Sequence, residues 1–109
     1  MRPQITFADF QKLDLMIGKI IKVEKVENAD KLLKIQVDLG EETRQILVGM
    51  AEFYSEDELI GKQIVALINL EPRKIRGEES EGMLLAADVD GKPVIISPCE
   101  EVPTGSVVR

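Results

Sequence analysis

The chain contains no histidine, no tryptophan and only one cysteine, Cys99. Histidine is the most frequent general base and a common zinc ligand, so its absence excludes the usual catalytic triad and a Cys/His zinc site. One cysteine cannot form an intrachain disulfide, and we expect Cys99 to be a small buried hydrophobic residue. Carboxylates are plentiful, but most stand beside turn residues, where they are solvated charges. The sequence therefore argues against an enzyme, a metal or a cofactor, and a small hydrolase built on paired carboxylates is the weakest hypothesis.

Long apolar runs and aromatic residues are also scarce. No apolar run approaches the roughly 18 residues of a membrane span, and no signal-peptide core follows the N-terminus. We therefore expect a cytoplasmic protein with no membrane partner. Aromatic residues make up only 4% of the chain. This scarcity disfavours recognition of single-stranded nucleic acid by stacking.

Positive charge is in the minority and locally concentrated. The 109 residues fit a single domain, residues 1–109, with a formal net charge of -6. Phosphate repulsion would oppose general nucleic-acid binding by such a chain. Arg73, Lys74 and Arg76 nevertheless stand close together in a turn-rich connector, residues 69–83, between two apolar runs. A local cationic site on an acidic chain indicates a binding loop on a rigid scaffold.

Hydrophobic periodicity predicts short strands and two short helices. In the first strand we expect Ile17, Ile21 and Val23 on one face, with a bulge suggested by Gly18 and by the adjacent Ile20 and Ile21. In chain order we first expect a helix over 6–13, which would lie across one end of a sheet with Phe7 and Phe10 packed, then a strand over 15–26, a turn over 27–31 and strands over 33–39 and 43–48. A second helix, capped by Ser55 and ended by Gly61, would be followed by a strand over 63–70, the connector and a strand over 83–87. The chain would end with a hairpin turn at Asp90 and Gly91 and an extended, docked tail over 98–109.

Three strands, a short helix and two more strands are the order of an OB-fold, an all-β, five-stranded, partly open Greek-key barrel. Residues 10–88 would form its core, and residues 89–109 would add a C-terminal extension. OB-fold ligands lie across strands two and three, between the loops that join strands 1 and 2 and strands 4 and 5. These loops would be residues 27–31 and 71–82. The second contains the cationic cluster.

Several short motifs occur together in one order and spacing. They are Asp-Leu-Met-Ile-Gly-Lys-Ile at 14–20, Ala-Asp-Lys-Leu at 29–32, Val-Asp-Leu-Gly at 37–40, Arg-Gln-Ile-Leu-Val-Gly at 44–49, Asn-Leu at 69–70, Lys-Ile-Arg-Gly at 74–77 and Ser-Glu-Gly-Met at 80–83. Through them, residues 10–87 resemble the tRNA-binding domain appended to methionyl-tRNA synthetases. The family usually has His-Pro before the Ala-Asp pair, where this chain has Glu27 and Asn28.

The resemblance implies an OB-fold homodimer that binds the outer corner of tRNA by shape and assists the catalytic region of a methionyl-tRNA synthetase, with no chemistry of its own. The cations would pair with phosphates, the Ser80 hydroxyl with a phosphate or 2'-hydroxyl, and the Met83 thioether with a base or ribose. By position, the implied RNA-contacting residues are Asn69, Lys74, Arg76, Ser80 and Met83, followed by Lys31 and Arg73.

Each of these residues also has a structural explanation. The cations could be solvated charges that balance neighbouring glutamates, Met83 a core residue, Asn69 a hydrogen bonder at a strand end, and Lys31 a surface turn residue. An alternative function is a protein-interaction or chaperone-like module on the same barrel. The strand over 63–70, apolar on both faces, requires a second cover, either a helix or another chain. Together with the valine-rich tail, it favours a two-fold dimer.

Overall fold

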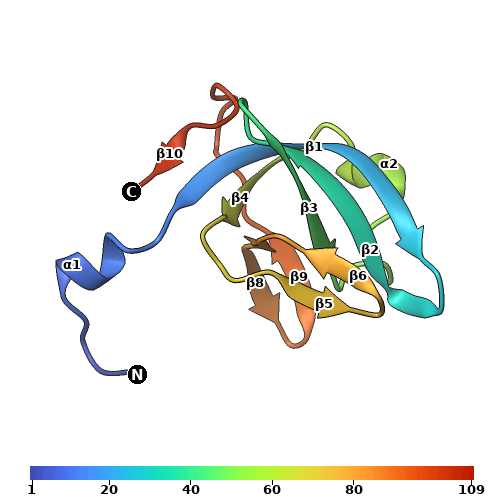
Figure 1. Cartoon of the computed structure of the whole chain (residues 1–109), viewed down its shortest axis with the longest axis horizontal. Helices are drawn as coiled ribbons and strands as arrows, with labels where there is room; N and C mark the ends of the chain where they lie inside the picture. The colour runs from blue at the N-terminus through green and yellow to red at the C-terminus, as the bar shows by residue number, and fades with distance from the viewer.

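The computed structural model describes all 109 residues, which form antiparallel β-structure with two helices of four residues each (Figure 1). In chain order the elements are α1 (Phe7–Phe10), β1 (Leu15–Val26), β2 (Ala29–Asp38), β3 (Thr43–Val48), α2 (Glu56–Leu59), β4 (Gln63–Leu67), β5 (Arg73–Ile75), β6 (Glu78–Ser80), β7 (Met83–Leu84), β8 (Ala86–Val89), β9 (Lys92–Ile95) and β10 (Val107–Val108).

The main sheet has the strand order β3-β2-β1-β4-β7, and all its neighbouring strands are antiparallel. β10 pairs with the start of β1. The ladder does not continue from β7 to β3, but in this gap the Glu81 N–H donates to the Gln45 carbonyl at 2.8 Å. The predicted all-β OB-fold is confirmed as a partly open barrel. Its expected fifth strand, 83–87, is divided at Leu85 into β7 and β8.

The barrel core follows the alternation of β2. Leu33, Ile35 and Val37 point inward and are at most 2% exposed, as the sequence pattern predicts. Strands β1, β3, β4 and β7, helix α2 and the residues Leu39 and Met50, which follow β2 and β3, contribute the remaining side chains. The main cluster of buried residues comprises Ile20, Val23, Leu33, Ile35, Val37, Leu39, Ile46, Val48, Met50, Leu59, Ile64, Ala66 and Leu84.

A bulge in β1 reverses its facing pattern. The register against β2 shifts between Ile20 and Lys22, which confirms the predicted irregularity. Ile20 is fully buried in the core, and because one extra residue is inserted after it, the next core side chain is Val23 instead of Lys22, while Ile21 is 48% exposed. The expectation that Ile21 shares a buried face with Val23 was therefore wrong.

Helix α2 has the predicted N-terminal cap. Ser55 and Glu58 form a reciprocal capping box on α2, and Gly61 follows with a left-handed φ of 84°. The hydrogen bond from the Ser55 backbone N–H, followed by the contribution of the Ser55 side chain, holds the pKa of the Glu58 carboxyl below its usual value.

Helix α1 projects from the barrel instead of lying across the sheet (Figure 1). The Thr6 hydroxyl accepts from the Asp9 N–H at 3.1 Å, but no residue of the helix is buried. Phe7 is 71% exposed and stacks only on Phe10, at a ring-centroid distance of 6.3 Å. The predicted docking of α1 and packing of Phe7 were therefore wrong; the start of β1, which follows the helix, is paired with β4 and β10 and not with α1.

The C-terminal tail covers the outer face of β1 and β4. Val102 exchanges two hydrogen bonds with the Gln63 side chain, at 2.7 and 3.1 Å, and Ile17 bonds through its backbone to Gly105 and Ser106. Ile17 and its cross-strand partner Val65 are only 5% and 7% exposed. The docked tail confirms the prediction, and this cover belongs to the same chain rather than to a helix or a second chain. Cys99 lies on this tail and is exposed, so the expectation of a buried cysteine was wrong.

Candidate nucleic-acid interface

The cationic connector is a β-hairpin rather than a loop. Strands β5 and β6 pair antiparallel and are joined by Arg76 and Gly77, whose φ angles are 53° and 81°. Two successive left-handed residues are the signature of the tight hairpin turn whose twist matches the flanking strands. We call residues 73–80 the cationic hairpin.

The register of the cationic hairpin separates its side chains onto two faces. Lys74 lies opposite Glu79 on one face, and Arg73 and Ile75 lie opposite Ser80 and Glu78 on the other. Arg73, Lys74 and Arg76 are exposed, and none of them takes part in the four ion pairs of the structure. The hairpin therefore offers three cations to solvent.

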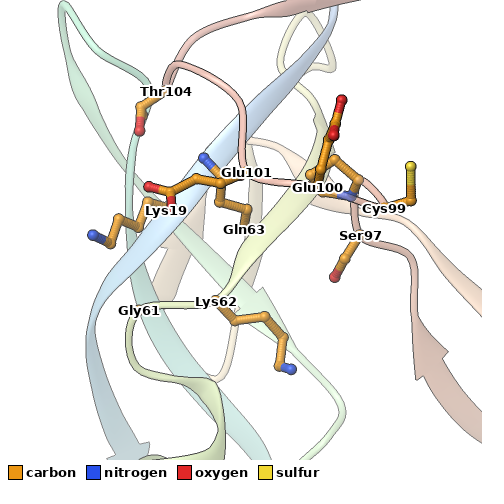
Figure 2. A pocket seen from close by; sticks show the side chains of 10 residues that line it. Lys19, Gly61, Lys62, Gln63, Ser97, Cys99, Glu100, Glu101 and Thr104 are labelled. Atoms are coloured by element: carbon orange, nitrogen blue, oxygen red, sulfur yellow. The ribbon is translucent and has the colours of Figure 1, made fainter.

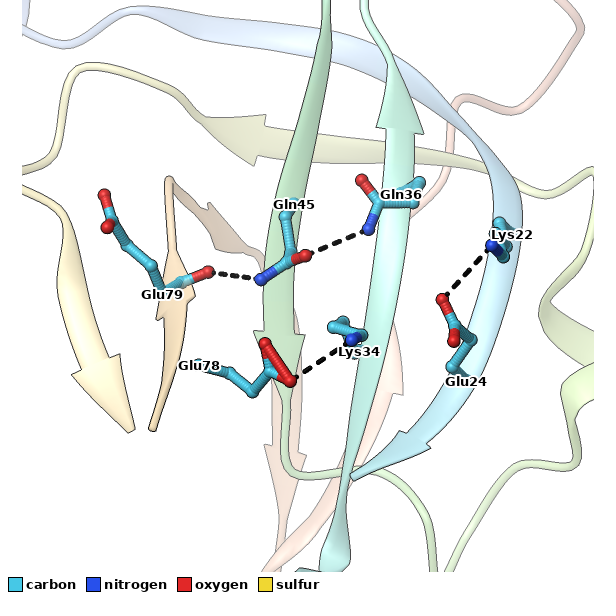
Figure 3. A network of polar contacts seen from close by, with 7 residues as sticks. All are labelled: Lys22, Glu24, Lys34, Gln36, Gln45, Glu78 and Glu79. Carbon is cyan, nitrogen blue, oxygen red and sulfur yellow. Dashed lines mark hydrogen bonds and ion pairs between the residues drawn. The ribbon is translucent and has the colours of Figure 1, made fainter. Parts of the chain in front are cut away.

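Polar side chains of the main sheet fasten the cationic hairpin (Figure 3). Lys34 of β2 pairs with Glu78 at 3.2 Å and thereby offsets one of the hairpin's carboxylates. The Gln45 side chain donates to the Glu79 carbonyl at 2.8 Å and accepts from Gln36 at 3.1 Å. The hairpin is thus joined through β3 to β2.

A small apolar cluster brings the two predicted binding loops together. Ile75 of the cationic hairpin packs against a group formed by Val26 and Ala29, which flank the β1–β2 turn, and Leu47 of β3. Figure 1 shows the tip of β5 and β6 beside this turn, where β2 begins. Lys31 is exposed nearby, although the turn is shorter than predicted and Lys31 belongs to β2. The turn and the cationic hairpin therefore form one end of the molecule.

Ser80 is a structural residue. It is 1% exposed, its hydroxyl accepts from the Leu47 N–H at 3.0 Å, and it donates to the Gly82 carbonyl at 3.1 Å. A hydroxyl engaged in this way cannot reach a phosphate or a ribose. The expectation that Ser80 contacts RNA directly is therefore wrong for this structure.

Asn69 fastens the first end of the connector to the chain that precedes β1. Its Oδ1 accepts from the Asp14 N–H at 2.8 Å, and its Nδ2 donates to the Lys12 carbonyl at 2.6 Å. Asn69 is thus the strand-end hydrogen bonder of the alternative interpretation. Met83 is 38% exposed and shares a shallow, mainly apolar hollow with Arg73. The Met83 residue is thus accessible from solvent, as a ligand contact requires.

A second hollow lies on the far side of the barrel, under the tail (Figure 2). Lys19, Lys62, Glu100 and Glu101 are among its ten lining residues. Their side chains point in different directions, and the Cys99 thiol points away from the lysines (Figure 2). No three His, Cys, Asp or Glu side chains come together as a metal site. None of the helices is long and apolar enough to cross a membrane.

An OB-fold barrel with a cationic hairpin beside its β1–β2 turn has the architecture of a nucleic-acid-binding module. The family model described as "Putative tRNA binding domain" matches residues 15–107. The chain belongs to this tRNA-binding domain family, and within it to the domains found in methionyl-tRNA synthetases and related proteins.

Individual relatives and solved structures support this family assignment. The chain is 50% identical over 107 residues to the methionine–tRNA ligase of Archaeoglobus fulgidus, a match that covers 98% of the chain and 16% of the ligase. It therefore spans about one sixth of that relative, corresponding to the tRNA-binding domain and not to the catalytic region. Among solved structures, a MetRS-related protein from Pyrococcus horikoshii has a TM-score of 0.93 and 38% identity, covering 99% of this chain and all of that one. The chaperone CsaA of Bacillus anthracis has a TM-score of 0.89 and 30% identity, covering 98% of this chain and all of that one.

Proposed function

We propose that this domain binds folded tRNA through the cationic hairpin and thereby assists a cytoplasmic methionyl-tRNA synthetase in aminoacylation, with no catalytic group of its own. The observation that carries the proposal is the exposure of Arg73, Lys74 and Arg76 outside any ion pair on a chain of net charge -6. A compact cationic site on an acidic body favours a ligand whose phosphates reach that site alone.

The contacts divide into phosphate binding and shape recognition. Lys74 and Arg76 at the tip would pair with phosphates, and Arg73 and Lys31 would extend the contact along the same end of the molecule. Met83 would lie against a base or ribose. Asn69 supports the interface through the backbone that it holds. Few aromatic residues are available, so recognition of the folded RNA shape is favoured over stacking of a single strand.

A tRNA titration at several salt concentrations tests this function. If about three phosphates are neutralised, the logarithm of the association constant should fall with the logarithm of salt with a slope of about -2 to -3. A protein that binds no tRNA, or binds it without salt dependence, would contradict the proposal. An unstructured RNA of equal length is the control, and it should bind more weakly than folded tRNA.

Dimerisation is the second part of the proposal. Phe7, Leu13 and Val107 are 71%, 43% and 59% exposed and line one apolar hollow between α1 and the tail. β10 is paired with β1 along one edge and leaves its other edge without a strand. A two-fold copy would cover both the apolar surface and this strand edge. Sedimentation at increasing protein concentration should show a dimer, and a monomer throughout would contradict it.

A chaperone-like module is the alternative, favoured by the similarity to CsaA. In that function the apolar hollow between α1 and the tail would hold unfolded polypeptide, and the hairpin cations would be dispensable. An unfolded client protein should then bind equally well to a variant lacking Lys74 and Arg76. Failure to bind any client at concentrations that saturate tRNA binding would remove this alternative.

A further inference from the structure

The cationic hairpin is attached to the barrel mainly by side chains. Neither β5 nor β6 belongs to the main sheet; the two strands pair only with each other. The backbone bond from Glu81 to Gln45 lies just beyond its base. Because an isolated two-stranded hairpin is marginally stable in water, its direction depends on the groups that hold its base.

Arg44 of β3 holds both ends of the segment that carries the cationic hairpin. Its Nη1 donates to the carbonyl of Ile68, which precedes the segment, and to the carbonyl of Glu81, which follows it, at 3.3 Å. These two carbonyls are 13 residues apart in sequence. A single guanidinium therefore joins the point where the chain leaves the barrel to the point where it returns.

The surroundings of Arg44 fix this guanidinium in place. Its Nε donates to Glu42 at 2.8 Å, and the side chain is only 28% exposed. The Glu42 carboxylate offsets the charge of Arg44, and the nearby carbonyls accept its N–H groups. The guanidinium of Arg44 is thus engaged in contacts within the protein, unlike the three exposed cations of the hairpin.

We propose that Arg44 is a positioning residue for RNA binding: it sets the direction in which the cationic hairpin presents Lys74 and Arg76, without contacting RNA itself. This inference rests on the proposed RNA-binding role of the hairpin. Arginine suits the position because its planar fork of donors can reach two carbonyls and a carboxylate together, whereas a lysine ammonium is a point charge without that fixed geometry.

Two substitutions of Arg44 distinguish its role in positioning the hairpin from the effect of its positive charge. Arg44→Met removes the guanidinium, and we expect about a tenfold loss of tRNA affinity, because a mobile hairpin must be ordered again on binding. Arg44→Lys keeps the charge, and we expect tRNA affinity to fall by about threefold or more, because a lysine cannot hold the Ile68 and Glu81 carbonyls and the Glu42 carboxylate together. In both variants the slope of affinity against salt should match that of the wild type, since no phosphate contact is lost. Lys22→Met is the control for removing one positive charge elsewhere, and it should stay within about twofold of the wild type.

A double-mutant cycle tests whether Arg44 acts through the hairpin. In a background of Lys74→Ala and Arg76→Ala, Arg44→Met should have no further effect on tRNA affinity at low salt. Additive losses would overturn the proposal, because they would mean an independent contact. A salt slope reduced by about one unit in Arg44→Met would overturn it for the same reason. Unchanged affinity in both Arg44 variants would also overturn it.

Hydrogen exchange of the free protein gives a readout that needs no RNA. Amides of residues 73–80 should exchange faster in both Arg44 variants, while the amides of the β1–β2 ladder keep their protection. Faster exchange throughout the barrel would overturn the proposal, because Arg44 would then support the whole fold. Unchanged exchange in the hairpin would overturn it as well. A wild-type protein that fails to bind tRNA would instead contradict the proposed function, so the two failures are distinguishable.

Discussion

Lys74 and Arg76 differ from several other cations of the chain in how they are held. Lys34 and Arg44 are partly buried and paired with carboxylates, whereas Lys74 and Arg76 are exposed at the hairpin tip and unpaired. Exposed, unpaired cations of this kind have little effect on the free energy of unfolding and are available to bind phosphates.

Replacement of both Lys74 and Arg76 by alanine should weaken tRNA binding without unfolding the domain. Each lost phosphate contact should reduce the magnitude of the salt slope by about 0.7 to 0.9. Fluorescence titrations at several salt concentrations measure the slope, and thermal unfolding checks the fold. Lys22→Ala is the matched control for loss of a cation outside the hairpin. An unchanged slope in the double variant would show that these two cations do not contact the RNA.

At Ser80, the structure predicts an effect on stability. Ser80→Ala leaves the buried Leu47 N–H without its acceptor and should lower the free energy of unfolding by about 1–3 kcal/mol. Ser97 is exposed, and Ser97→Ala should have almost no effect. Urea unfolding of the two variants measures the difference, and equal stabilities would contradict the role assigned to the Ser80 hydroxyl.

Gly18 is constrained by the inside of the barrel. A Cβ at this position would collide with Val37 and lie 3.0 Å from Leu39. Gly18→Ala should therefore destabilise the fold by about 1–3 kcal/mol, since the tightly packed core must shift. Gly49 has open space at the corresponding position and serves as the control, because Gly49→Ala meets no atom within 4 Å. Chemical unfolding that gives the two variants equal stability would refute the packing argument.

At the scale of elements, the capping box of α2 should make stability depend on pH. The lowered pKa of Glu58 means that its carboxylate is favoured in the folded state. This contribution is present above the ordinary pKa of a glutamate and is lost as the pH falls through the lowered value. Glu58→Gln should therefore be less stable than the wild type at pH 7, with the difference shrinking at pH 3. A constant difference between the two unfolding midpoints across this range would contradict the assignment.

Elements with a regular pattern could be predicted from the sequence, and those set by tertiary contacts could not. The alternation in β2 and the cap at Ser55 are local signals, and both are confirmed. The bulge at Ile20 could be expected, but the face that it turns inward depends on the pairing with β2. Helix α1 has a capped, amphipathic sequence, but this local sequence does not determine which surface the helix packs against.

The sequence indicated the segment that carries the candidate site, but not the structure of that segment. The clustering of charge at positions 73–76 identified the segment, but the turn at Arg76 and Gly77 lacks the usual Asn-Gly signal, so the hairpin was missed. Ser80 and Asn69 were named as RNA contacts by their positions in the family resemblance, and Asn69 was also considered as a hydrogen bonder at a strand end. Their internal hydrogen bonds join residues that are 33 and 55 positions apart, which no local pattern reveals.

At the scale of the whole molecule, RNA binding and association are expected to be linked. If two copies pair through α1 and β10, one tRNA can meet two cationic hairpins, and the second contact becomes intramolecular. Val107→Lys places a charge on the exposed strand edge and should give a monomer. Its tRNA affinity should fall by about tenfold or more, although the substitution adds positive charge. Sedimentation and titration together measure the link, and a monomeric variant with undiminished affinity would show that each copy binds alone.

The left-handed backbone at Arg76 has a consequence for the evolution of this domain. Glycine would adopt a φ of 53° without the steric cost that a larger residue incurs, so it would favour the turn. It would also remove the outermost positive charge that we assign to RNA. Resistance to heat and retention of tRNA therefore select different residues at position 76. Laboratory evolution for thermostability alone is expected to replace Arg76 early and to produce domains that are more thermostable but bind tRNA more weakly.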